Sequence, residues 1–377
     1  MMSCARRCLA IAVVASSPLA AQGTLSTQGL GFPPGQLGTR ALSMGGSIGE
    51  ADPWSPLNPA AVGMLLTSLI TMQVEPEYRQ LKVGSATQNT SIVRFPQFMG
   101  SMPVGSRWGI MLSASTLFDR TWSTTSRDSQ VIGPDTIRST VSRLSDGSLA
   151  DVRVATSYAP VSWLRIGLGL HTYTGRDAIR QERLFHDTVH FEGDTIRTTL
   201  WFSGHAISVG AMTYWPRKAA LGVTYRRGGS LRTFQGDALA QTGSAPDHIG
   251  LTAEYLGIEG TTLAVRLAKD GWSRLDGIAP SLNVHEGWDI AAGADVQGPR
   301  FAAGFLGMRV GFRNRTLPFS TSATVPVTER TFSGGFGFPL ALQRAELNVA
   351  VLRASRSGPV GVFENAWTIS TGFSVRP

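Results

Sequence analysis

The chain of 377 residues has a formal net charge of +8 at pH 7, to which Arg6 and Arg7 contribute, and only 16% of its residues are charged. A typical soluble protein has about 25% charged residues, so this composition, with its 43 glycines, favours close-packed strands over helices. The basic residues are spread evenly along the chain, which argues against a nucleic-acid-binding patch.

The first 21 residues are predicted to be a secretory signal peptide. Two arginines precede the apolar run at 8–15, and small residues suitable for cleavage follow at 18–22. Both cysteines, Cys4 and Cys8, lie in this segment, so the mature chain has no disulfide and no cysteine metal site. No later apolar run approaches the ~18 residues of a membrane-spanning helix. If the mature chain crosses a membrane, it does so as strands.

Period-two alternation is the main signal in the rest of the chain. At the C-terminal end, Trp367, Ile369 and Phe373 fall on one face, and Thr368 and Ser370 fall on the other. The same alternation predicts about fourteen strands, most of them close to the ~9–11 residues that cross a bilayer with a tilt. These strands are expected near 65–74, 89–100, 107–121, 149–159, 163–175, 199–214, 219–227, 248–256, 261–270, 287–296, 300–312, 330–339, 344–353 and 365–376.

The connections between these segments alternate in length. Short ones are predicted at 101–106, 160–162, 215–218, 257–260, 297–299 and 340–343, and long polar ones at 75–88, 122–148, 176–198, 228–247, 271–286, 313–329 and 354–364. Short turns on one side and long loops on the other are typical of outer-membrane barrels. Six tryptophans at strand ends suit the membrane interface, namely Trp108, Trp163, Trp201, Trp215, Trp288 and Trp367.

We therefore predict an all-β fold, a membrane-spanning antiparallel up-and-down β-barrel of about 14 strands in the bacterial outer membrane. A soluble β-sandwich is the alternative, but its outward face would carry Lys, Glu and Thr. In this sequence the polar face holds Gly, Ser and charges of both signs, which suits the interior of a barrel. A ring of fourteen strands is wide enough to need a plug.

Ten charged residues on the polar face are predicted to line the lumen. They are Asp151, Arg153, Arg165, Arg226, Glu254, Arg266, Asp289, Asp295, Arg309 and Glu346. Their mixed signs favour pairing that fills the lumen over a path for a polar solute, because a selective pore usually shows one sign at its constriction.

Two pairs of residues could carry chemistry, and neither is favoured. His186 and His190 have a spacing that chelates a metal on a helix, but in an extended chain they lie ~13 Å apart. Asp247 and His248 are neighbours in a predicted strand and so point to opposite faces. No nucleophile elbow or phosphate loop is present. We predict no catalytic residues, no metal, no cofactor and no enzymatic activity.

The stretch at 39–65 is rich in glycine and proline and precedes every predicted strand. No strand comes before it and no lysine follows its glycines, so it is not a phosphate loop. As a free leader it would leave Leu42, Met44, Ile48 and Trp54 in water. We interpret it as part of a hatch at 22–64 that folds into the periplasmic mouth of a barrel at 65–377.

Nine residues of this stretch, Gly38, Arg40, Ala41, Met44, Gly45, Gly46, Asn58, Pro59 and Ala60, resemble the N-terminal hatch of FadL-type outer-membrane transporters and the related PorV and PorQ proteins. The segments at 311–319, 328–340 and 364–377 resemble the last strands of the same superfamily. The interval before Asn58 is shorter and richer in proline than is usual there. The resemblance implies a fourteen-stranded barrel plugged by its N-terminus.

Two functions follow from the two branches of that superfamily. The first is passive transport of hydrophobic small molecules, gated by the hatch. Its gating residues would be Arg40, Leu42, Met44, Gly45, Gly46, Ile48, Trp54, Asn58 and Pro59. The second is a barrel that binds protein partners in secretion or surface attachment, as in type IX secretion. The implied partners are outer-membrane lipid and either a hydrophobic small molecule or a secretion-system or surface protein, with no nucleic acid.

Overall fold

The computed structural model describes residues 25–132, 135–186, 191–279, 283–301, 304–359 and 361–377. The predicted signal peptide and His190 lie outside these residues. The strands are β1 (Leu69–Val83), β2 (Ala86–Val104), β3 (Trp108–Asp119), β4 (Trp122–Ile132), β5 (Asp135–Val161), β6 (Leu164–Phe185), β7 (Asp194–Trp215), β8 (Ala219–Gln235), β9 (Ala238–Ser244), β10 (Asp247–Ile258), β11 (Thr261–Gly271), β12 (Asn283–Val284), β13 (Gly287–Phe301), β14 (Gly304–Leu317), β15 (Phe319–Ser320), β16 (Val327–Leu340), β17 (Ala345–Ser357) and β18 (Val362–Val375). In the described part of the chain, helix is limited to α1 (Thr39–Ser43) and to short 3-10 turns at Leu25–Thr27, Ala61–Met64, Trp272–Leu275 and Ala341–Gln343. Within the described residues, no helix is long and apolar enough to cross a membrane.

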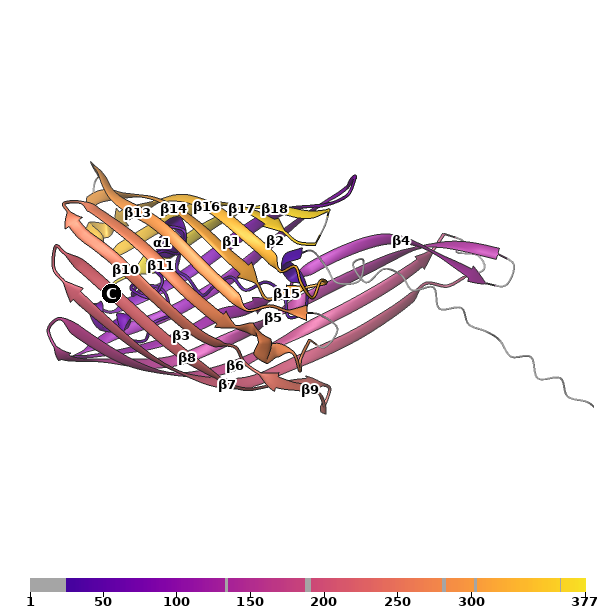
Figure 1. Ribbon diagram of the computed structural model, residues 1–377, viewed down its shortest axis with the longest axis horizontal. Helices are drawn as coiled ribbons and strands as arrows, with labels where there is room; N and C mark the ends of the chain where they lie inside the picture. Colours follow the sequence, from indigo (N-terminus) through magenta and orange to yellow (C-terminus); the bar gives the residue numbers. More distant parts are fainter. Residues whose placement is uncertain (1–24, 133–134, 187–190, 280–282, 302–303, 360) are drawn as a thin grey trace, which may run out of the picture.

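Fourteen strands close into an antiparallel barrel, which confirms the predicted fold class. Around the ring the order is β1, β2, β3, β5, β6, β7, β8, β10, β11, β13, β14, β16, β17 and β18, and β18 pairs back with β1. Each ring strand overlaps one of the segments predicted from alternation. Among the described strands, β4 pairs only with β5, and β9 pairs only with β8. Figure 1 shows the inclined strands, with the C-terminus at the end that carries the short turns.

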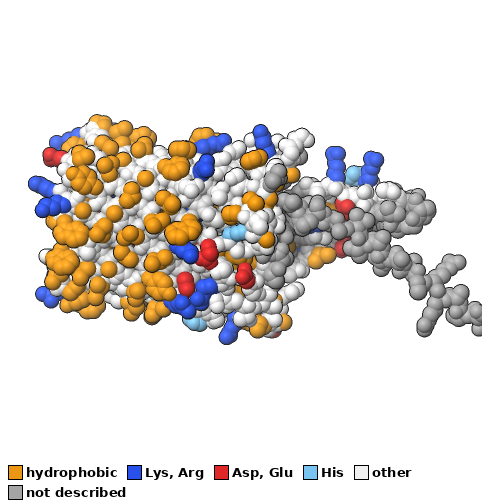
Figure 2. All heavy atoms as spheres, viewed as in Figure 1, with side chains coloured by type: hydrophobic (Ala, Val, Ile, Leu, Met, Phe, Trp, Pro, Cys, Tyr) orange, Lys and Arg blue, Asp and Glu red, His pale blue; other side chains and the backbone are white. Residues whose placement is uncertain are grey.

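The two faces of the ring strands differ as the alternation predicted. In β18, Trp367 and Ile369 are exposed on the outside, whereas Glu364 and Ser370 are fully buried on the inside. Figure 2 shows that hydrophobic side chains cover the outer wall of the barrel over the part nearer the short turns. An outward apolar band on a closed ring satisfies the backbone and faces lipid, as a bilayer requires.

The predicted long loops are wrong in part, because strands continue into them. The predicted loop at 122–148 holds β4 and the first half of β5, and the one at 176–198 holds the ends of β6 and β7. Figure 1 shows that these strands project beyond the barrel as a sheet. Neither face of this projection contacts lipid, so its Ser, Thr and Arg residues lack the apolar alternation that reveals the other strands. The short turn expected at 297–299 is also strand, since β13 runs on to Phe301.

Residues 25–64, called the luminal segment below, are buried or half-buried and lie inside the ring, and the connection at 65–68 includes the exposed Leu66. Side chains of the luminal segment contact inward-facing residues of many strands, and Ala41, Met44, Glu50 and Asn58 are buried or nearly so. α1 packs against β14, β16, β17 and β18, and the 3-10 turn at Ala61–Met64 packs against β2, β3, β5, β6 and β7. The barrel therefore has a filled interior.

Candidate functional site in the lumen

The luminal segment follows the lumen from the long-loop end to the short-turn end. Near the long loops, Ser26 donates to Glu364 of β18, with Oγ and Oε1 2.7 Å apart. Near the short turns, the carbonyl of Gly63 accepts from Arg165 of β6 at 3.1 Å. The segment therefore extends beyond the periplasmic mouth where the sequence placed the hatch. A ring of fourteen strands has an interior too wide for its own side chains to close, so a long filling segment is needed.

A tight turn of the luminal segment rests directly on the barrel wall. Gly45 and Gly46 have φ values of 70° and 87°, a conformation that other residues rarely adopt. The wall residue opposite is Gly311 of β14, where a Cβ would lie 2.0 Å from the carbonyl carbon of Met44. The glycines on the polar face thus allow two backbones to touch.

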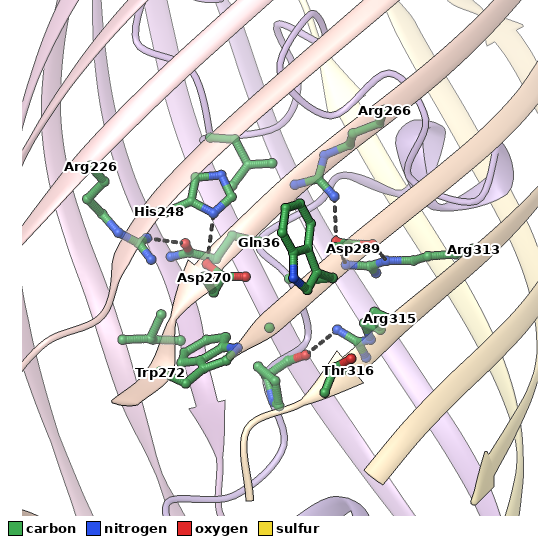
Figure 3. A pocket seen from close by; sticks show the side chains of 16 residues that line it. Gln36, Arg226, His248, Arg266, Asp270, Trp272, Asp289, Arg313, Arg315 and Thr316 are labelled. Atoms are coloured by element: carbon green, nitrogen blue, oxygen red, sulfur yellow. Dashed lines mark hydrogen bonds and ion pairs between the residues drawn. The ribbon is translucent and has the colours of Figure 1, made fainter. Parts of the chain in front are cut away.

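Glu50 is the most strongly bonded side chain of the luminal segment. Its carboxylate accepts from Nε and Nη2 of Arg266 at 2.7 and 2.9 Å and from Oγ1 of Thr252 at 2.8 Å. Arg266 also donates to Asp289 at 2.5 Å, and Arg313 donates to the same carboxylate at 2.6 Å. Figure 3 shows Asp289 between Arg266 and Arg313, which approach it from adjoining strands. The pairing of opposite charges offsets the cost of burying them.

Phe32 lies among four guanidinium groups. Its ring centroid is 4.6 Å from Cζ of Arg356, 4.9 Å from those of Arg94 and Arg315, and 5.7 Å from that of Arg79. Carboxylates compensate these charges through ion pairs of Arg94 and Arg79 with Glu77, of Arg315 with Glu329, and of Arg356 with Glu77, Glu329 and Glu364. Cation–π contacts of this kind hold an aromatic ring in a polar interior.

Eight of the ten predicted lumen-lining residues fall into three groups. Asp151, Arg153 and Arg226 meet near Gln36, Arg266 and Asp289 meet at Glu50, and Asp295, Arg309 and Glu346 meet near the short turns. Arg165 contacts Gly63, and Glu254 is half-buried. The sequence missed Glu77, Arg79, Arg94, Arg313, Arg315, Glu329, Arg356 and Glu364, because seven of these lie in stretches taken for loops. These seven would have been found if the period-two alternation had been followed beyond the predicted ends of the strands.

The predicted hatch residues occupy several places along the lumen. Leu42, Met44 and Ile48 share one apolar cluster with Leu37 and Leu57. The ring of Trp54 lies between Arg40 and Arg376, each 5.6 Å from its centroid, and Arg40 is 3.6 Å from Asp295.

The Asn58 to Ala60 turn is fixed by its own hydrogen bonds. Asn58 donates to the carbonyl of Glu50 at 2.8 Å and accepts from the backbone N–H of Ala60 at 2.9 Å. Pro59 lies beside wall glycines of β6 and β7.

Asp151, His171 and Ser208 are connected in the order of a Ser–His–Asp triad. His171 Nδ1 is 2.9 Å from Asp151, and its Nε2 is 2.8 Å from Ser208 Oγ. Asp151 also accepts from Arg153 and Gln36 at 3.0 and 2.8 Å. Ser208 is buried, and neither of the two cavities at this depth is lined by it. These bonds form part of the ion-paired filling, with no room for an acyl substrate.

Of the two residue pairs weighed for chemistry, Asp247 and His248 have separate partners, and His190 of the other pair lies outside the described residues. Asp247 contacts Arg227 and Arg274, whereas His248 Nδ1 is 2.8 Å from Asp270 on the other face. Among the described residues, no group of His, Cys, Asp and Glu could hold a metal ion.

The deep cavities are small. One of about 40 Å³ lies between Gln36, His248, Asp270 and Arg315, which Figure 3 shows facing a common space. A second, also about 40 Å³, lies beside Phe32. Such volumes hold water molecules but not a ligand of the size that occupies pockets of ~300–1,000 Å³.

The wall is incompletely paired between β2 and β3. Their register begins at Val104 and Trp108 near the short turn and ends at Gln97 and Ser115, although both strands continue. Phe95 and Pro96 have no register partner on either neighbouring strand among the described pairs. Proline cannot donate to a ladder and is confined to edges and bulges, which accounts for the break. We call this break the β2–β3 seam.

The end of β3 stays paired with β5 and, where β2 no longer pairs with it, also pairs with the luminal segment. At the seam Asp119 and Phe32 exchange both backbone hydrogen bonds, each 2.8 Å long. Leu117, Phe118 and Asp119 are all buried, so both faces of this part of β3 are covered by protein. The luminal segment thus completes the wall where β2 no longer does.

The chain matches no protein-family model and no curated protein. Its structure is similar to that of a FadL homologue of Pseudomonas aeruginosa, with a TM-score of 0.61, 11% identity, and 92% of this chain and 99% of that chain covered. It is also similar to the toluene transporter TbuX of Ralstonia pickettii, with a TM-score of 0.61, 14% identity, and 90% and 98% covered. The third comparison is CymD, described as a monoaromatic hydrocarbon channel, with a TM-score of 0.56, 13% identity, and 90% and 97% covered.

These likenesses confirm the predicted resemblance to FadL-type barrels at the level of the fold. Together with the closed ring and its outward apolar band, the fold makes this chain a barrel of the outer membrane.

Proposed function

We propose that this barrel lets hydrophobic small molecules diffuse passively across the outer membrane, and that the luminal segment is the hatch that gates them. The observation that carries the proposal is the bridge between Phe32 and Asp119 at the β2–β3 seam. Because the luminal segment is hydrogen-bonded to β3 where β3 no longer pairs with β2, displacement of the segment would free the seam. A molecule could then pass sideways from the lumen into the bilayer.

The chemistry around the seam favours an apolar cargo. Phe95 and Val93 are exposed on the lipid side of β2, and Leu117 and Phe118 are buried on the side of the lumen. An apolar molecule gains from leaving water for such surroundings, whereas a polar solute loses hydrogen bonds there. The toluene transporter and the monoaromatic hydrocarbon channel of similar fold support a small aromatic hydrocarbon as cargo.

In this proposal the charged lumen holds the hatch and does not select a solute. Both signs are present, and the ion pairs join wall to wall and wall to hatch. The residues assigned to the hatch remain Arg40, Leu42, Met44, Gly45, Gly46, Ile48, Trp54, Asn58 and Pro59. Their wall partners include Arg266, Asp295 and Gly311.

A reversible lock tests the proposal. Phe32 and Asp119 form a hydrogen-bonded antiparallel pair, whose Cα atoms lie about 5.5 Å apart, within the range of a disulfide. The double variant Phe32→Cys/Asp119→Cys should therefore tie the hatch to β3 when oxidised. Uptake of labelled toluene by cells that carry the barrel and lack other hydrocarbon channels should fall on oxidation and return on reduction.

Two controls separate the lock from its side effects. Each single cysteine variant reports the loss of the Phe32 ring or the Asp119 carboxylate without a lock. The pair Thr125→Cys/Ser142→Cys forms a disulfide between register partners of the projecting sheet and should leave uptake unchanged. Equal uptake by oxidised and reduced Phe32→Cys/Asp119→Cys would contradict gating by this segment, and no uptake above cells without the barrel would contradict transport.

A second candidate function is the binding of a protein partner in secretion or surface attachment. The projecting sheet favours it, because β4 pairs only with β5 in the described chain and so leaves one edge open. An open edge is a template for strand addition by another chain. Affinity purification from intact outer membrane tests this candidate: a stoichiometric protein partner that is lost when residues 122–147 are shortened would support it.

A further inference from the structure

The outward face of β1, β17 and β18 changes from apolar to polar toward the long loops. Register places Tyr78 of β1 beside Trp367 of β18, and Trp367 beside Arg353 of β17. The next row toward the long loops holds Gln80, Asn365 and Ser355. Aromatic rings followed by polar side chains mark the level where the hydrocarbon of a bilayer meets its head groups.

A groove of about 540 Å³ lies on this face. Its lining includes Tyr78, Gln80, Asn89, Ser91, Arg353, Asn365 and Trp367, which offer hydroxyl, amide and guanidinium groups. The guanidinium of Arg353 lies 5.1 Å from the centre of the Trp367 ring. The ring positions the cation at the edge of the groove.

The surroundings of the groove are positively charged without compensation. Lys82 and Arg330 lie on the same outward face, since Arg330 is the register partner of Ser355. None of Lys82, Arg330 and Arg353 has an ion-pair partner among the described residues. The carboxylates of these strands, among them Glu77, Glu329 and Glu364, point inward and are bound by buried arginines.

A second pair of a cation and an aromatic ring on the barrel has an acidic partner that compensates its charge. Lys269 lies 5.6 Å from the centre of the Trp288 ring, and Arg353 lies 5.1 Å from the centre of the Trp367 ring. Lys269 is also 3.3 Å from Glu286, so that site is neutral. The groove on β1, β17 and β18 has the same cation and ring but no acid.

We propose that this groove binds the phosphorylated head group of a lipid in the outer leaflet. The long loops face outward in such barrels, so the groove lies at the level of outer-leaflet head groups. Arg353 and Arg330 would donate to phosphate oxygens, and Lys82 would add attraction at longer range. Tyr78 and Trp367 would contact the boundary between head group and acyl chains.

The test uses the intact barrel, purified in detergent and freed of lipid, with lipid A that carries two phosphates as the probe. Binding is measured by native mass spectrometry for the wild type, for Lys82→Gln/Arg330→Gln/Arg353→Gln, and for the control Lys269→Gln. We expect the triple variant to bind at least about tenfold more weakly, because each cation near the head groups contributes to attraction. The control should bind as the wild type does.

Two further arms identify the chemistry that is recognised. Lipid A without phosphates should bind the wild type as weakly as the intact lipid binds the triple variant. Millimolar inorganic phosphate should fail to displace the lipid, because it has no acyl chains to hold it at the barrel wall. Equal binding by the triple variant, equal binding of the dephosphorylated lipid, or displacement by free phosphate would each overturn the proposal.

Discussion

Replacement of Glu50 by glutamine should loosen the luminal segment. Glu50 is fully buried, and its carboxylate accepts hydrogen bonds from Arg266 at 2.7 and 2.9 Å and from Thr252 at 2.8 Å. Glu50→Gln keeps the shape of the side chain and removes its charge. Arg266 then keeps Asp289, 2.5 Å away, as its remaining anionic partner.

The free-energy cost of Glu50→Gln depends on the ion pair that Arg266 keeps with Asp289. Removal of one partner of a buried ion pair costs about 3–5 kcal/mol. Asp289 still compensates Arg266, so the lower end of this range applies, about 3 kcal/mol. Since 1.4 kcal/mol corresponds to a factor of ten, the population with a displaced segment should rise about a hundredfold.

A single cysteine can report this population. Both natural cysteines, Cys4 and Cys8, precede the expected cleavage point, so a cysteine in place of the buried Met44 would be alone in the mature chain. The rate of maleimide labelling of Met44→Cys should rise about a hundredfold when Glu50→Gln is added. The control is Glu182→Gln, which breaks the exposed pair of Arg180 and Glu182 at 3.1 Å. Exposed pairs contribute little, so labelling should not change.

The reasoning fails if Glu50→Gln and Glu182→Gln label Met44→Cys at the same rate. That result would mean that apolar packing around Met44, and not the ion pair, keeps the segment in place. A loss of the folded barrel would be a different outcome, and the mobility of unheated protein on a gel separates it from a change in the segment alone.

Two other substitutions test the contacts between segment and wall. Gly311→Val should displace the turn at Met44 and Gly45 while the strands remain, because a Cβ at 311 would lie 2.0 Å from the carbonyl carbon of Met44; unchanged labelling of Met44→Cys would contradict this. Pro96→Thr should restore a backbone donor to β2 and extend its ladder toward β3, so toluene uptake should fall without a change in the mobility of the unheated barrel. Uptake equal to that of the wild type would mean that the seam is not the path.

The sequence revealed the fourteen strands because each has lipid on one side and protein on the other. In β18 this contrast places Trp367 and Ile369 outside and Ser370 inside, and the period of two is visible without any partner. The projecting parts of β4 to β7 have no such contrast, since water or protein covers both faces. These polar stretches were therefore predicted to be loops, although the backbones of β4, β5, β6 and β7 pair continuously there.

Which charged side chains pair inside the lumen depends on which strands meet when the ring closes. The sequence alone does not give the order of strands around the ring. Arg356 and Glu77 are 279 positions apart and meet only because β18 pairs with β1. The contact of Gly311 with Met44 similarly requires the segment to pass along β14. The sequence did indicate that the lumen charges would pair, since their signs are mixed, but it could not say which residues form each pair.

In the proposed gating, only part of the luminal segment needs to move. A path along the lumen would require Glu50 and its ion pairs to separate, whereas the seam is closed by Phe32 and the residues around it. Displacement of residues 25–36 alone would open the seam and leave the later anchors in place. A lock at Thr39 and Ser370 distinguishes the two paths, because their hydroxyl oxygens are 2.9 Å apart and thiols at these positions lie within reach of a disulfide. Oxidised Thr39→Cys/Ser370→Cys should therefore transport toluene at the rate of its reduced form, in contrast to the Phe32→Cys/Asp119→Cys lock, and a loss of uptake in both would show that the whole segment must leave.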